Sequence, residues 1–169
     1  MDSIIELART LGPYAICGEG NVSVKDDDCF WVKASGTSLD TLEKKDLVAC
    51  KMSGVPFDSL GLKPSIETGF HAWFQREFDA VKFVAHTHPP KTMEVVCSEQ
   101  IWSFAAHRLF PDQIVRNGAK SCVVPYAMPG KPLLEEIKKS VLAFIEEEKL
   151  SLIHISEPTR PRLISYAVF

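Results

Sequence analysis

The chain has 169 residues, of which 46% are hydrophobic and 24% are charged, as is typical of a globular protein and not of a disordered or fibrous one. This length suits one domain with a sizeable core. A net charge of -3 without a block of Lys and Arg argues against nucleic acid as a partner.

The first residues, MDSIIELARTLG, contain an acidic side chain at position 2 and no long apolar stretch. This pattern favours a cytoplasmic protein without a signal peptide or a membrane anchor. The five cysteines are an odd number without a CxxC pair, so we expect reduced, packed thiols and no disulfide framework. They are Cys17, Cys29, Cys50, Cys97 and Cys122.

Hydrophobic periodicity predicts helices that alternate with short strands. Helices are expected over 2–11, 66–78 and 92–109 and from Pro132 onward. Strands are expected as a hairpin within 18–36, then at 47–52, at 80–88 and at 121–125. Strands alternating with helices indicate a layered α/β domain in which helices bury a sheet.

An acidic residue stands at the predicted start of the helix 66–78. Ser65 is the expected N-cap, and Ile66 begins the apolar face. Glu67 then falls in the first turn, where the helix dipole favours a carboxylate. Such an acid can serve helix stability alone, which is the alternative to a catalytic role.

The stretch FVAHTHPP places two histidines at the end of a predicted strand. Because strand side chains alternate between faces, His86 and His88 are expected to point the same way. They supply two of the three protein ligands that a catalytic zinc site usually has, and a pair of exposed histidines is the alternative. We expect His71 and His107 to be packed or satisfied side chains and not ligands.

Two glycine-bearing loops, CGEGN and ASGTS, flank the predicted hairpin. They place Gly20, Asn21, Ser35 and Gly36 at strand ends. Backbone N–H groups in such loops can converge on an anion. The same residue types are also the ordinary residues of plain turns.

Five motifs in order, GNVSV, KASGTSL, KPSIETGFHAWF, HTHP and FPDQIV…G…VVPYAMPG, resemble the class II aldolase and adducin family over roughly residues 3–150. The resemblance implies a layered α/β/α domain with a central, mainly antiparallel sheet. It implies that His86 and His88 bind a divalent metal, usually Zn²⁺, and that Glu67 is the catalytic acid/base. The positions that would surround the substrate phosphate are Gly20, Asn21, Ser35, Gly36 and Ser65.

The resemblance predicts a zinc-dependent aldolase-type lyase that acts on a small hydroxy-carbonyl sugar or sugar phosphate. It would cleave the substrate by a retro-aldol step through a metal-stabilised enediolate, because a bound cation can take the developing charge. The alternatives are a sugar-phosphate 4-epimerase of the same family, a non-catalytic adducin-like module, or an inactive fragment. Ile66 replaces a serine of some phosphate-binding relatives, so phosphate on the substrate stays open. A homo-oligomer, commonly a tetramer, is also implied.

The family's third histidine ligand, in an Asn-His-Gly motif, has no direct counterpart here. Near its expected place the chain reads LIHISEPTRPRLISYAVF, where His154 is the candidate third ligand. This segment resembles translated sequencing-adapter read-through. We therefore expect a class II aldolase-like domain over 1–151, incomplete at its C-terminus, and a non-native tail over 152–169. The alternative is a genuine divergence in which His154 completes the site.

Overall fold

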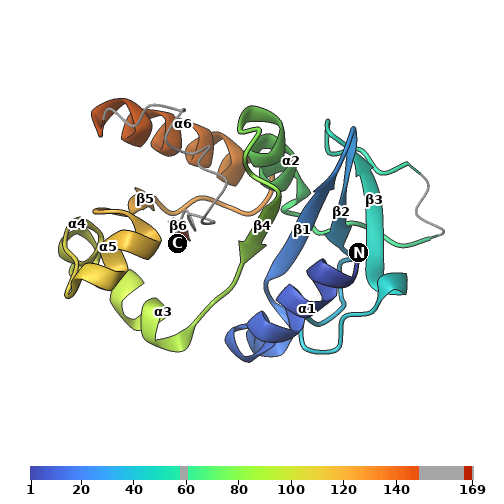
Figure 1. Cartoon of the computed structure of the whole chain (residues 1–169), viewed down its shortest axis with the longest axis horizontal. Coiled ribbons are helices and arrows are strands. Elements are labelled where there is room, and N and C mark those ends of the chain that lie inside the picture. Colours follow the sequence, from blue (N-terminus) through green and yellow to red (C-terminus); the bar gives the residue numbers. More distant parts are fainter. Residues whose placement is uncertain (58–60, 149–165, 169) are drawn as a thin grey trace. The chain divides into compact units, whose positions relative to one another are not determined.

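The computed structural model describes residues 1–57, 61–148 and 166–168 (Figure 1). The contacts divide the chain into two compact units, Met1–Pro90 and Lys91–Phe169. The predicted boundary at residue 151 lies outside the described residues, so the division into 1–151 and 152–169 stays a prediction. Within the described ranges, no helix is both long and apolar enough to cross a membrane.

The first unit is built on a four-stranded antiparallel sheet with the order β3-β2-β1-β4 (Figure 1). Its strands are β1 (Asn21–Asp26), β2 (Cys29–Lys33), β3 (Leu47–Lys51) and β4 (Phe83–His86). β1 and β2 form the predicted hairpin. At the end of the β1–β4 ladder, the register places Asn21 opposite His86, so these two candidate site residues are neighbours across adjacent strands.

Helices pack on both faces of this sheet. α1 (Asp2–Leu11) packs on the face formed by Val22 and Val24 of β1. Ser23, between these two valines, points to the opposite face, where α2 (Thr68–Glu77) lies. The buried clusters are Ile4, Ala8, Val22, Val24, Leu39, Leu42 and Leu47 on the first face, and Phe30, Val32, Ala34, Val48, Cys50 and Ala72 on the second. The predicted layered α/β/α arrangement with a mainly antiparallel sheet is confirmed.

Three short 3-10 helices complete the described structure of this unit. They are η1 (Gly12–Tyr14), η2 (Ile16–Gly18) and η3 (Lys44–Asp46). The first two form the connection between α1 and β1. This connection contacts the histidine segment, because the backbone N–H of His88 donates to the carbonyl of Tyr14 at 2.9 Å.

The start of α2 differs from the prediction. The helix begins at Thr68, not at residue 66, and Glu67 is the N-cap. The three preceding residues form a turn in which the Thr68 N–H donates to the Ser65 carbonyl and the Glu67 N–H donates to the Ser65 hydroxyl oxygen. Ile66 is therefore 71% exposed and does not begin the apolar face. The apolar face of α2 is formed instead by the buried aromatic side chains of Phe70, Trp73 and Phe74.

Where the structure describes the second unit, it combines four helices with a short parallel strand pair. The helices are α3 (Pro90–Val96), α4 (Ile101–Ala106), α5 (Pro111–Asn117) and α6 (Lys131–Glu147). β5 (Cys122–Val124) pairs in parallel with β6 (Tyr166–Val168). α6 packs against β5 and buries Leu133, Ile137 and Val141 at helical spacing.

The single helix expected over 92–109 is wrong, because the chain forms α3 and α4 there. Ser98 explains the break. Its hydroxyl donates to the Val95 carbonyl and accepts a hydrogen bond from the Gln100 N–H, so it competes with the helical ladder. The next helix, α5, has Pro111 in its first turn, where proline is tolerated well.

Candidate functional site

The two histidines of FVAHTHPP lie together, as predicted. Their ring centroids are 4.6 Å apart, although β4 ends at His86 and His88 lies beyond the strand. The backbone bond from His88 to Tyr14 holds this extension in place. Gly20 also touches the segment, because a Cβ added there would lie 2.7 Å from the His86 carbonyl oxygen. The φ of Gly20 is +80°, a conformation that other residues rarely adopt.

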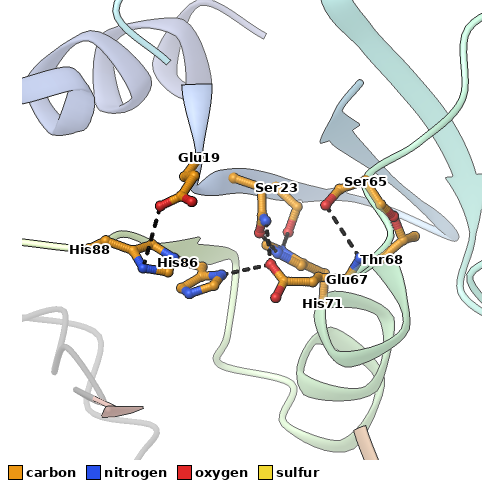
Figure 2. A network of polar contacts seen from close by, with 9 residues as sticks. Glu19, Ser23, Ser65, Glu67, Thr68, His71, His86 and His88 are labelled. Atoms are coloured by element: carbon orange, nitrogen blue, oxygen red, sulfur yellow. Dashed lines mark hydrogen bonds and ion pairs between the residues drawn. The ribbon is translucent and has the colours of Figure 1, made fainter. Parts of the chain in front are cut away.

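Glu67 is the residue around which the polar side chains gather (Figure 2). Its Oε2 lies 2.7 Å from Nδ1 of His86 and accepts a 2.6 Å hydrogen bond from Nδ2 of Asn21. Its side chain is only 12% exposed. Oε1 has no hydrogen-bond partner among the described residues, so its lone pairs remain available. Glu67 is therefore a member of a cluster and not only a helix-start acid.

The surroundings of Glu67 act on its pKa in opposite directions. Burial raises the pKa, because a buried carboxylate loses hydration. The hydrogen bond and charge of His86 and the hydrogen bond from Asn21 lower it more. The pKa therefore lies below its ordinary value, and the carboxyl group is ionised at neutral pH.

Partial burial lowers the pKa of His88, and the nearby His86 adds to this effect. Glu19 opposes it, with Oε2 at 3.8 Å from Nδ1 of His88 (Figure 2). A lowered pKa keeps the imidazole neutral near pH 7, and only a neutral imidazole can bind a metal.

His71 is fully buried, as expected for a packed histidine. Its Nδ1 lies 2.7 Å from the Ser23 hydroxyl oxygen, and its Nε2 contacts Oδ1 of Asn21. Burial lowers its pKa to about 3, so the ring is neutral. Sequence reasoning did not foresee that this histidine would touch Asn21, which in turn contacts Glu67. His107, in the second unit, is exposed, and its Nδ1 bonds to the Ser103 carbonyl.

The residues expected around an anion differ in which hydrogen-bond donors are still available to bind one. Asn21 is buried and committed to the Glu67 cluster. The backbone N–H of Ser35 donates to the Lys63 carbonyl, and that of Ser65 donates to the Lys33 carbonyl. The remaining position, Gly36, has a φ of +81° and open space around it. The hydroxyl groups of the two serines therefore remain as donors, and their substrate-binding role stays a prediction.

The residues present fit a metal ion in part. His86 directs Nδ1 to a carboxylate, as metal-binding histidines commonly do, and its Nε2 points away from that bond as a candidate ligand atom. In the part of the chain that the structure describes, no group of three or more His, Cys, Asp or Glu side chains is arranged to hold a metal. The predicted third ligand, His154, lies outside the described residues.

Three further polar or reactive groups are structural. Lys33 is buried, and its Nζ donates to the carbonyl groups of Thr37 and Ala34. Burial raises the pKa of the thiols of Cys50 and Cys122 to about 11, as expected for inert packing residues. The expectation of a packed thiol is wrong for Cys97, which is exposed.

Comparisons with known proteins agree with the fold and with the motif pattern. The family model described as "Class II Aldolase and Adducin N-terminal domain" matches residues 4–154. A 3-oxo-tetronate 4-phosphate decarboxylase of Haemophilus influenzae is 31% identical over 124 residues, which are 73% of this chain and 58% of the relative. An L-fuculose phosphate aldolase of Methanococcus maripaludis is 29% identical over 90 residues, 52% of this chain and 48% of the relative.

Among solved structures, YgbL of Escherichia coli aligns with a TM-score of 0.70 at 23% identity, over 82% of this chain and 68% of that one. This likeness supports the fold alone. The chain spans less than two thirds of the length of the curated relatives described above.

Proposed function

Because the chain belongs to the class II aldolase and adducin N-terminal domain family, we propose that it forms part of a divalent-metal-dependent lyase. The reaction is cleavage of a carbon–carbon bond beside a carbonyl group in a small hydroxy-carbonyl sugar or sugar phosphate. The observation that carries the proposal is the placement of the Glu67 carboxylate 2.7 Å from His86, whose ring adjoins that of His88.

His86 and His88 hold the metal in this proposal, with His154 or another group beyond the described residues as the third ligand. When bound, a divalent cation such as Zn²⁺ polarises a carbonyl oxygen and takes up negative charge there. The protein's contribution is to orient both imidazoles. Glu67 orients the His86 ring by accepting a hydrogen bond from its Nδ1–H, and the backbone bond to Tyr14 positions His88.

Glu67 moves the proton. Its Oε2 is held by Asn21 and His86, and its Oε1 is free to face a substrate. Because the lowered pKa makes the group a carboxylate at neutral pH, Oε1 takes a proton from the substrate hydroxyl as the carbon–carbon bond breaks. The same oxygen returns a proton to the carbon that is left with the electron pair.

The hydroxyl groups of Ser35 and Ser65, with Gly20 and Gly36, are proposed to contact the distal end of the substrate, while Asn21 holds Glu67. A phosphate there accepts hydrogen bonds from such donors. Ile66 contributes no donor, so an unphosphorylated sugar belongs in the test panel as well.

The test begins with metal binding, measured as zinc per chain after dialysis of the purified protein. We expect about one zinc per chain. The double variant His86→Ala, His88→Ala should lose more than about 100-fold of the zinc affinity. His107→Ala is the matched control, because this exposed histidine lies outside the cluster. A non-catalytic adducin-like module would bind no zinc in any of these variants.

The second arm measures aldehyde release from a panel of ketose phosphates and unphosphorylated ketoses. Release that depends on zinc and on Glu67 supports the lyase. If the zinc-loaded protein releases no aldehyde from any of these substrates, the proposal of an aldolase-type lyase is wrong. A 4-epimerase would return a substrate isomer, which product analysis detects.

A second candidate is decarboxylation of a 3-oxo acid phosphate. The observation in its favour is that the 124-residue match is to a 3-oxo-tetronate 4-phosphate decarboxylase. Loss of CO₂ from a 3-oxo acid leaves an electron pair on the carbon beside a carbonyl, as aldol cleavage does, so the same residues suit both reactions. Release of CO₂ without aldehyde identifies the decarboxylase.

We also propose that the protein is cytoplasmic and that it assembles into a homo-oligomer, specifically a tetramer. Light scattering of the purified chain measures the oligomeric state directly.

A further inference from the structure

A row of buried polar side chains lies beneath Glu67, and the proposed chemistry does not use most of it. The row runs from Gln75 through Ser23, His71 and Asn21 to the carboxylate. Gln75, Ser23 and His71 are completely buried. Burying so many polar groups is costly unless their hydrogen bonds are satisfied, so the direction of each bond matters.

The donor-to-acceptor direction of the hydrogen bonds is set at Gln75, the end of the row farthest from Glu67 along the bonds. Nε2 of Gln75 lies 3.4 Å from the Lys82 carbonyl oxygen and 2.9 Å from the Ser23 hydroxyl oxygen. A carbonyl oxygen can only accept, so the amide must present its NH₂ group there. The same NH₂ group then donates its second hydrogen to Ser23.

This orientation of the Gln75 amide leaves one buried polar atom without a hydrogen bond to any described residue. Oε1 of Gln75 is buried and has no hydrogen-bond partner among the described residues. Turning the amide over would let Oε1 accept from the Ser23 hydroxyl, but it would also place Oε1 against the Lys82 carbonyl oxygen. The unpaired Oε1 is the consequence of an amide that the Lys82 carbonyl holds in one orientation.

Each later bond follows from the first. Since Ser23 accepts from Gln75, its own hydroxyl hydrogen is directed to Nδ1 of His71. A neutral imidazole that accepts at Nδ1 carries its hydrogen on Nε2. His71 therefore donates from Nε2 to Oδ1 of Asn21. The Asn21 amide is thereby turned so that its NH₂ group donates to Glu67.

We propose that His71 is a positioning residue for the candidate site: held in its Nε2–H tautomer by Ser23 and Gln75, it orients Asn21 to donate to Oε2 of Glu67. The one-way row keeps Oε2 occupied and leaves Oε1 for the substrate. This inference rests on the proposed role of Glu67 for its meaning in catalysis, but the tautomer of His71 is a property of the folded chain alone.

The test is a long-range ¹H–¹⁵N correlation spectrum of the full chain labelled with ¹⁵N-histidine. We expect His71 to be neutral, with its hydrogen on Nε2, from about pH 5 to pH 8. Glu67→Gln should leave this tautomer unchanged, because the Lys82 carbonyl and not the carboxylate sets the direction. Gln75→Met should shift His71 toward the Nδ1–H tautomer, while Arg76→Met, the exposed neighbour on α2, should not.

An Nδ1–H or doubly protonated His71 in the unaltered chain would overturn the proposal, because Asn21 would then have to donate to His71 and turn its oxygen to Glu67. A change of tautomer in Glu67→Gln, or none in Gln75→Met, would also overturn it. If the tautomer is as expected but neither aldehyde nor CO₂ is released, the proposed function fails and the positioning role of His71 stands.

Discussion

The two compact units bury different kinds of side chain. Among the described residues of Met1–Pro90, six polar or charged side chains are buried: Asn21, Ser23, Lys33, Thr68, His71 and Gln75. In the described part of Lys91–Phe169, every buried side chain is apolar. Burial of a polar group costs free energy that apolar packing does not cost. The first unit therefore has features that stability alone does not require, and its buried polar row ends at the candidate catalytic residue.

Large apolar side chains are exposed in both units, and the second unit adds to them a core without buried polar groups in its described part. Several large apolar side chains there are exposed, among them Leu109 at 85% and Tyr126 at 69%. Its described core is a simple stripe from α6 against β5. The contrast indicates that substitutions in the first unit should change chemistry as well as stability, whereas those in the described part of the second unit should change stability alone.

The largest effect is expected for Glu67→Gln, which keeps the size of the side chain but removes proton transfer. We expect kcat/KM for the released product to fall by about 10²–10⁴-fold. The matched control from the second unit is Glu135→Gln on the exposed side of α6, with activity unchanged. Equal losses in both variants would break the contrast between the units.

The next effect is a pH dependence that belongs to His71. Its pKa is lowered from 6.5 to about 3 in the folded chain, so between these values unfolding takes up one proton. This contribution to stability is complete above about pH 6.5 and is lost as the pH falls, by about 1.4 kcal/mol per pH unit.

Urea unfolding over this pH range measures that slope. His71→Gln should remove the contribution, and His107→Gln, a change of an exposed histidine in the second unit, should retain it. A slope that survives in His71→Gln would mean that other groups cause the acid sensitivity.

A smaller effect separates two glycines within the first unit. Gly20 and Gly36 have nearly equal positive φ angles, so an alanine costs about 1–2 kcal/mol of backbone strain at either position. At Gly20 the added Cβ also meets the His86 carbonyl, whereas at Gly36 it meets nothing within 4 Å. Gly20→Ala should therefore lose more stability and should weaken zinc binding, and Gly36→Ala should not affect zinc. Identical zinc affinities would show that the loop does not support His86.

The smallest effects are expected in the second unit. Leu109→Gln should change the free energy of unfolding by less than about 0.5 kcal/mol, because the side chain is already in water. Ile137→Val, in the buried stripe of α6, should cost about 1 kcal/mol. Both should leave activity unchanged, and a loss of activity in either would contradict the division of roles.

Much of the fold followed from local patterns. The helix 2–11, the hairpin and the strand at 47–52 were predicted nearly to the residue, because alternation and 3.6-residue periodicity report directly which face is buried. The errors lie where a single polar side chain overrides periodicity. Ser98 ends one helix and begins another. Ser65 delays the start of α2 and leaves Ile66 exposed.

By itself the sequence determined the family, the layered fold and the closeness of His86 and His88, because ordered motifs and strand alternation are local properties of the chain. Only the tertiary structure decided which side chains Glu67 and His71 contact. Their partners lie 46 to 50 residues away in Asn21 and Ser23, and a packed helix and sheet must first bring them together. Whether a carboxylate is a helix-start acid or the end of a buried hydrogen-bond row depends on that packing.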